Sequence, residues 1–363
     1  WYRKMLEVQS IFQRFGSDYL KNHPLSPVQA KAFRAICNCR TAGLGAHLDT
    51  CDHCGFVKIS YNSCRNRHCP KCQAFAREQW IEKQNSHRLN TNYFHVVFTL
   101  PEELNAVFLR SQKTAYTLFF HAVSQTLLEL CASHTYLGAV PGITAVLHTW
   151  GQNLMYHPHI HCIVTGGGLT GNGKWRTSRK KFFLPAKVLS RKFRGKLLSF
   201  LKQAGFSFPY NLYHKEWVVY CKPPFKSVGK VIEYLGRYTH RIAISNSRLL
   251  QVQDSKVSFS WRDYRDHSRK KVMTLSAAEF IRRFMLHVLP PGFCKIRHFG
   301  IFAPRDKSAR MNLCRKLTAT SFCPPKPASA LDTLRKMLGQ DFDRCPSCGI
   351  GRLARASPTS STI

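Results

Sequence analysis

The sequence predicts an α+β fold in which helices flank a central antiparallel sheet, preceded by a small domain organised by cysteine and histidine. Two observations predict the sheet. Apolar runs of strand length alternate with helical patterns from residue 93 onward, and a short connection joins two of these strands, which favours antiparallel pairing. A third observation predicts the small domain: seven of the 15 cysteines lie between Cys37 and Cys72, in a stretch too poor in apolar residues to fold by burial alone.

The predicted elements follow one another along the chain in four segments. Residues 1–36 are predicted to be helical with a break at Pro24, and residues 37–90 form the zinc-binding domain. The α+β domain covers residues 91–290, and a basic region covers residues 291–363. Strands are predicted at 93–99, 143–150, 159–165 and 217–222, a hairpin at 241–260, and helices at 102–134, 185–204, 227–238 and 277–289.

The charge of the chain predicts a polyanionic partner. Lys and Arg total 55 against 19 acidic residues, which gives a formal net charge of +36. Between Leu130 and Lys215 there is no Asp or Glu, whereas a solvated basic face, the alternative interpretation, normally mixes both signs. We therefore expect nucleic acid as the partner. The residues expected to contact DNA are Arg65, Arg67, Lys71, Arg179, Lys180, Lys181 and Arg237.

The cysteine-rich segment has the spacing of a zinc site. Cys51 and Cys54 form one C-x2-C motif, Cys69 and Cys72 form another, and 14 residues separate the two. Two such motifs hold one tetrahedral zinc ion, and further donors in the segment suffice for a second. We expect one or two structural Zn²⁺ ions here, with Cys37 left over. The predicted ligands are Cys39, Cys51, Cys54, Cys64, His68, Cys69 and Cys72, with His47 as a further candidate.

A third C-x2-C motif lies near the C-terminus. Cys345 and Cys348 resemble half of a zinc ribbon, a possible zinc site whose other ligands are expected to be Cys314 and Cys323. Buried free thiols are the alternative interpretation for each of these cysteines.

A pair of histidines in a predicted strand indicates a second kind of metal site. His159 and His161 project to the same face of a strand, in a window without carboxylates. A catalytic Mg²⁺ or Mn²⁺ ion on two imidazoles needs a further protein ligand. We expect His148, because antiparallel pairing of the two strands brings it beside the pair; Gln152 and a distant acid such as Glu216 are the alternatives.

Two tyrosines provide candidate nucleophiles. Tyr234 and Tyr238 are four residues apart in a predicted helix and therefore lie on one face of it. A phenol attacks phosphorus only when a cation withdraws charge from the phosphate, so the pair requires a neighbouring metal ion. Packing of the two rings against the sheet is the alternative.

These motifs together resemble the HUH endonucleases, and specifically the two-tyrosine transposases of the insertion-sequence family numbered ninety-one and its ISCR-type relatives. The resemblance covers most of residues 37–250. It implies an HUH nuclease domain that nicks single-stranded DNA at element ends, links the 5′ end to a tyrosine and transfers strands by a rolling-circle mechanism. The matching segments are residues 61–72, His148–Leu154 through His161, Gly166–Gly168 and Tyr234–Ser245.

Two other functions remain open at this point. A rolling-circle replication initiator or conjugative relaxase uses the same chemistry, and a zinc-dependent nucleic-acid-binding protein uses none. No apolar run approaches the roughly 20 residues that a membrane helix needs, so we expect no membrane partner. The spacing of the cysteines favours a reducing compartment, and we expect a cytoplasmic, nucleoid-associated bacterial protein. The sequence does not determine the oligomeric state.

Overall fold

A computed structural model describes most of the chain, which is divided into two compact units. The described residues are 6–85, 87–179, 183–222, 236, 243–263, 266–322, 324, 329, 332, 333, 335, 339 and 341–355. Unit 1 comprises Trp1–Glu82, His240–Val288 and Lys326–Ile363, and unit 2 comprises Lys83–Thr239 and Leu289–Pro325. The units therefore differ from the four consecutive segments expected from the sequence, because each unit is assembled from separate stretches of chain.

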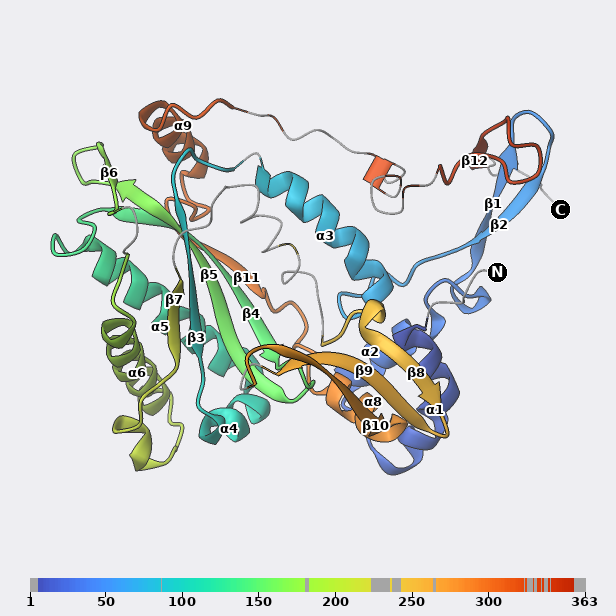
Figure 1. Cartoon of the computed structure of the whole chain (residues 1–363), viewed down its shortest axis with the longest axis horizontal. Helices are drawn as coiled ribbons and strands as arrows, with labels where there is room; N and C mark the ends of the chain where they lie inside the picture. The colour runs from blue at the N-terminus through green and yellow to red at the C-terminus, as the bar shows by residue number, and fades with distance from the viewer. Residues whose placement is uncertain are drawn as a thin grey trace. The chain divides into compact units, whose positions relative to one another are not determined.

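Unit 2 is built on a six-stranded sheet in which every neighbouring pair is antiparallel. The order is β11-β4-β5-β3-β7, and β6 pairs with β5 beside this path (Figure 1). The predicted antiparallel sheet is thus confirmed, and its long central strands hold the histidine motif. The strands are β3 (Tyr93–Thr99), β4 (Val140–Trp150), β5 (Tyr156–Leu169), β6 (Trp175–Thr177), β7 (Val219–Lys222) and β11 (Ile296–Gly300).

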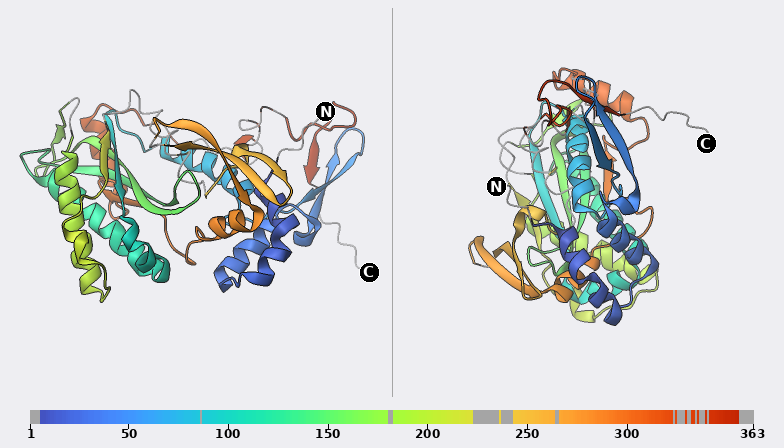
Figure 2. Two further views of the ribbon diagram at one scale, coloured as in Figure 1. Left: turned by 60° about the horizontal axis from the view of Figure 1, so that its bottom comes forward. Right: turned by 90° about the vertical axis from the view of Figure 1, so that its right-hand side faces the viewer.

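Two long helices cover one face of this sheet. Figure 2 shows α5 (Gln112–Ala132) and α6 (Ala186–Gln203) side by side, and both pack on strands of the sheet. The ring of Phe98 on β3 lies 5.0 Å from the ring of Phe193 on α6. Because side chains alternate along a strand, residues of the opposite parity point to the other face of the sheet. The other helical elements whose bounds the structure describes in unit 2 are η2 (Glu102–Leu104), α4 (Asn105–Arg110), η3 (Tyr210–Tyr213) and α9 (Lys307–Leu317).

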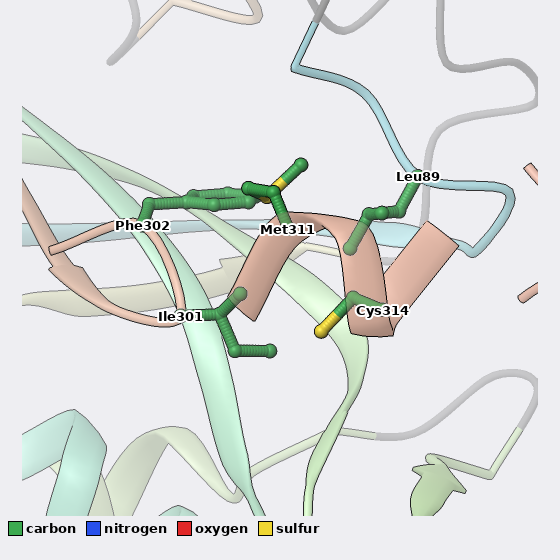
Figure 3. Close-up of a cluster of buried hydrophobic side chains, with 5 residues drawn as sticks. All are labelled: Leu89, Ile301, Phe302, Met311 and Cys314. Carbon is green, nitrogen blue, oxygen red and sulfur yellow. The ribbon is translucent and has the colours of Figure 1, made fainter. Parts of the chain in front are cut away.

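The segment after β11 belongs to the core of unit 2. Ile301 and Phe302 pack with Met311 and Cys314 of α9 and with Leu89, and all five are buried (Figure 3). Cys314 is fully buried in this apolar cluster. The expectation that Cys314 is a zinc ligand is therefore wrong, because its thiol is part of a hydrophobic core; Cys323 lies outside the described residues.

In unit 1 the N-terminal helices pack against a helix from a later part of the chain. The ring of Phe12 on α1 lies 5.0 Å from Phe33 on α2 and 5.2 Å from Phe284 on α8. A capping box at Ser26 starts α2, which places the helix break where the sequence predicts it. The elements are α1 (Val8–Asn22), α2 (Pro27–Asn38), η1 (Ala42–Leu44), β1 (Ala46–Cys51), β2 (Val57–Tyr61), α3 (Pro70–Asn85), η4 (Asn246–Arg248), β8 (Leu249–Gln253), β9 (Lys256–Asp263), β10 (Arg269–Ser276), α8 (Ala277–Met285) and β12 (Leu353–Arg355).

Several predicted elements change in detail. The helix predicted at 102–134 is broken at Ser111 into α4 and α5, and the predicted hairpin is a three-stranded sheet in the order β10-β9-β8. The helix predicted at 227–238 lies outside the described residues apart from Gly236. Among the helices that the structure describes, none has the length and apolar character to cross a membrane.

Candidate metal centres

Three histidines converge on the two central strands of unit 2. In the β4–β5 pairing, His148 stands directly opposite His159, and His161 is two residues further along β5. The candidate ligand atoms of His148, His159 and His161 all lie within 4.8 Å of one another. Since Ile160 pairs with Phe98 on the helix-covered face, the three imidazoles lie on the opposite face of the sheet. The register places His148 beside the histidine pair, and Glu216 does not belong to this group among the described residues. Gln152 lies beyond the end of β4, in the connection to β5.

Burial keeps two imidazoles of this group, those of His159 and His161, neutral. Loss of hydration lowers the pKa of His159 to about 4. It also lowers the pKa of His161 well below its ordinary value, with further contributions from the neighbouring His148 and His159. A neutral imidazole has a lone pair for a metal ion at neutral pH. His159 Nδ1 lies 2.7 Å from the carbonyl oxygen of His157, which accepts a hydrogen bond, so Nδ1 carries the proton and the lone pair is on Nε2.

The donor set fits a divalent transition-metal ion. Three converging imidazoles suit such ions, whereas carboxylate and water ligands suit Mg²⁺. Among the described residues, no Asp or Glu joins the three histidines. Of the two ions expected from the sequence, the residues therefore fit Mn²⁺ better than Mg²⁺.

His95 is a neighbour of this site that the sequence analysis does not single out. It is 3% exposed on β3, and its Nε2 atom lies 2.8 Å from Nδ1 of His161. Burial lowers the pKa of His95 to about 3, so it is neutral as well. The only signal in the sequence is a histidine within a largely apolar strand. Nothing in its position along the chain relates it to His159 and His161.

Four cysteines of unit 1 form a compact sulfur cluster. The Sγ atoms of Cys39, Cys64, Cys69 and Cys72 lie within 4.8 Å of one another. Cys39 caps the end of α2 and Cys72 lies in the first turn of α3, and their sulfurs are 3.7 Å apart. With a Zn–S bond of about 2.3 Å, two sulfurs of a tetrahedral zinc site are about 3.8 Å apart. The cluster therefore has the dimensions of a structural zinc site.

The remaining predicted ligands of the N-terminal segment do not join this cluster. His68 hydrogen-bonds through Nδ1 to Asn66 Oδ1 at 3.2 Å, and His47 lies 3.6 Å from Asp49. Cys51 and Cys54 lie instead with Cys345 and Cys348. The expectation that residues 39–72 supply both sets of ligands, with His68 among them, is wrong, because the turn between β1 and β2 directs its cysteines to the C-terminal segment.

The predicted DNA contacts have different environments. Arg65 and Arg179 are exposed, and Arg67 is half-buried. Lys71 Nζ lies 2.7 Å from Glu7 Oε2 and 2.6 Å from Gln9 Oε1, so this ammonium group is engaged within the protein. Tyr234, Tyr238, Arg237, Lys180 and Lys181 lie outside the described residues.

Two family models match parts of this chain. Residues 11–100 match the family described as "Transposase zinc-binding domain", and residues 142–310, which contain the three histidines, match the family described as "Putative transposase". Among solved structures, the conjugative relaxase TrwC in complex with mutant OriT DNA aligns with a TM-score of 0.28 and 12% identity, over 63% of this chain and 75% of that chain.

Relatives align along almost the whole chain. The sequence is 44% identical to the putative transposase y4qJ of Sinorhizobium fredii, over 96% of this chain and 94% of that protein. It is 28% identical to the transposase for insertion sequence element IS801 of Pseudomonas savastanoi pv. phaseolicola, over 95% of this chain and 87% of that protein. The chain therefore belongs to the IS91 family of transposases and carries the zinc-binding domain of that family in its N-terminal part.

Proposed function

We propose that this transposase cuts one strand of DNA at the ends of a mobile element, forms a 5′-phosphotyrosine link and transfers the strand by a rolling-circle mechanism. The observation that carries the proposal is the group of three converging histidines on adjacent strands, of which His148 and His161 are buried and His159 is half-buried. A divalent ion held there supplies a positive charge that polarises a phosphodiester and stabilises its charged transition state.

The nucleophile in this proposal is a phenol of Tyr234 or Tyr238. The phenol oxygen loses its proton to solvent and bonds to phosphorus, while the bond from phosphorus to the 3′ oxygen breaks. The 3′ oxygen takes up a proton and leaves as a hydroxyl group. A second tyrosine permits a second link of the same kind, which suits strand transfer between two ends.

The charge distribution supports DNA as the substrate. The formal net charge of +36, with no acid between Leu130 and Lys215, favours binding to phosphates that is strong and depends on salt. Exposed Arg179 lies in this acid-free stretch. The proposal that the substrate is single-stranded rests on the resemblance of the sequence motifs to the HUH endonucleases, which nick single-stranded DNA.

The test is covalent capture of labelled single-stranded DNA that carries an element end, with Mn²⁺ present. We expect an adduct that survives SDS with the native chain and none with the double variant Tyr234→Phe, Tyr238→Phe. Removing two hydroxyls changes packing little, so DNA binding by the double variant should persist. Tyr210→Phe, at a tyrosine that is 75% exposed in unit 2, is the matched control and should form the adduct normally.

Two results would contradict the proposal. An adduct that forms unchanged in the double variant excludes these tyrosines as nucleophiles. A native chain that binds the DNA but never becomes linked to it, at any Mn²⁺ concentration, supports a non-catalytic nucleic-acid-binding protein instead.

A further inference from the structure

A second sulfur cluster joins two segments of unit 1 that are far apart in the sequence. The Sγ atoms of Cys51, Cys54, Cys345 and Cys348 lie within 4.8 Å of one another. We propose that these four thiolates bind a second zinc ion, which fastens the C-terminal segment 341–355 to the β1–β2 hairpin. This inference does not depend on the proposed nuclease chemistry.

The distances fit zinc and exclude a disulfide bond. Cys51 Sγ lies 3.8 Å from Cys348 Sγ, and Cys54 Sγ lies 3.6 Å from Cys345 Sγ. Sulfurs around a tetrahedral zinc ion are about 3.8 Å apart, whereas bonded sulfurs of a disulfide are about 2.05 Å apart. Each of these two contacts joins a cysteine of one C-x2-C motif to a cysteine of the other.

The two C-x2-C motifs have the same local geometry. In each, the glycine after the second cysteine donates its N–H to the carbonyl of the first cysteine, Gly55 to Cys51 at 3.2 Å and Gly349 to Cys345 at 3.0 Å. Both glycines have left-handed backbone angles, with φ of 71° and 65°. Equal turns on opposite sides of one cluster are what two halves of a zinc ribbon require.

Backbone amide groups point at the sulfurs. Cys54 N lies 3.5 Å from Cys51 Sγ, and Gly351 N lies 3.3 Å from Cys348 Sγ. Such N–H groups stabilise a thiolate, the form of cysteine that binds metal. Gly351 also needs to lack a side chain, because a Cβ there would lie 2.5 Å from Cys51 Sγ.

Burial alone does not hold the C-terminal segment in place. Its strand β12 pairs with β1 over three residue pairs, from Asp49 with Arg355 to Cys51 with Leu353. Of the three residues of β12, Leu353 is half-buried and the other two are exposed. A strand of this length without an apolar core needs another source of stability, which a metal ion bound to both partners supplies.

The two cysteine clusters differ in which segments of the chain supply their ligands. All ligands of the Cys39 cluster come from residues 39–72, whereas Cys54 and Cys345 are 291 residues apart. Loss of the C-terminal segment therefore removes two ligands from the second site and none from the first.

The test counts zinc ions in the purified full chain and in variants. We expect the native chain to hold one zinc ion more than either Cys348→Ser or a chain that ends at residue 340, whatever the histidine site binds. Cys294→Ser, at an exposed cysteine outside both clusters, is the matched control and should hold as many zinc ions as the native chain. Cys348→His retains a zinc ligand at that position and should keep the second ion with lower affinity.

A measurement on the native chain guards against variants that fail to fold. Replacing zinc by ¹¹³Cd should give two NMR resonances in the range of cadmium bound by four sulfurs, which differs from the range of cadmium bound by histidines. A single resonance in that range, or an equal zinc content in the native chain and in Cys348→Ser, overturns the proposal.

Discussion

His95 Nε2 lies 2.8 Å from His161 Nδ1, and the two rings are nearly parallel, with an interplanar angle of 6°. This contact determines which nitrogen of His161 faces a metal ion. Nδ1 is occupied by the hydrogen bond, so Nε2 must be the ligand atom and the proton must sit on Nδ1. His161 then donates to His95, which accepts through Nε2 and carries its own proton on Nδ1. In this arrangement His95 is a positioning residue for the proposed catalytic metal.

We predict that His95→Leu weakens Mn²⁺ binding by roughly 10- to 100-fold, the usual effect of losing a partner that orients a metal ligand. His95→Gln offers a carbonyl oxygen as acceptor and should recover most of the affinity. Isothermal titration with Mn²⁺ measures both without relying on activity. Equal affinities for the Leu and Gln variants would mean that His95 only fills space.

The identity of the third ligand can be tested in the same way. Because His148 stands opposite His159 in the β4–β5 pairing, we expect His148→Ala to need far more Mn²⁺ for cleavage of single-stranded DNA. Gln152→Ala and Glu216→Ala should titrate like the native chain. If Gln152→Ala needs the extra metal and His148→Ala does not, the assignment of His148 fails.

Gly300 supports the edge of the histidine sheet. It has a φ of 61°, and a Cβ there would lie 1.9 Å from the carbonyl oxygen of Pro141 on β4. We expect Gly300→Ala to lower the free energy of unfolding by about 3 kcal/mol, since both backbone strain and a clash oppose it. Gly292→Ala has a similar φ of 67° but no neighbour within 4 Å, so it should cost about 1 kcal/mol. Urea unfolding of both variants measures the difference, and equal losses contradict the predicted clash.

The zinc-binding domain offers a paired test of DNA contact. Arg65 is exposed, whereas the ammonium group of Lys71 is paired with Glu7. We expect Arg65→Ala to weaken DNA binding and to reduce the slope of log affinity against log salt by about one. Lys71→Ala should leave that slope unchanged. A salt titration of binding by fluorescence anisotropy measures both slopes, and a reduced slope for Lys71→Ala alone would reverse the assignment.

The parts of the site that depend on local spacing could be predicted from the sequence. Alternation along one strand places His159 and His161 on one face, and the short connection between two strands brings His148 to them. Similarly, the largely apolar run at residues 93–99 predicts a strand, and β3 begins and ends at these same residues. These features depend on contacts between residues that are near one another in sequence.

Contacts between distant segments could not be predicted. The partners of Cys51 and Cys54 lie almost 300 residues further along the chain, and nothing in a C-x2-C motif states which other motif completes it. The strand β11 is only five residues long with no alternating pattern, yet it completes the sheet next to β4. His95 is likewise linked to His161 only by the register of β3 and β5.

The interleaving of the two units has a consequence for synthesis on the ribosome. Unit 2 ends at Pro325, so its sheet and α9 can fold while the part of unit 1 that follows is still inside the exit tunnel. Unit 1 contains β1 and β2, which are made before unit 2, but it must wait for β12, whose residues 353–355 are made after unit 2. A chain released between the two has a complete histidine sheet but an incomplete unit 1.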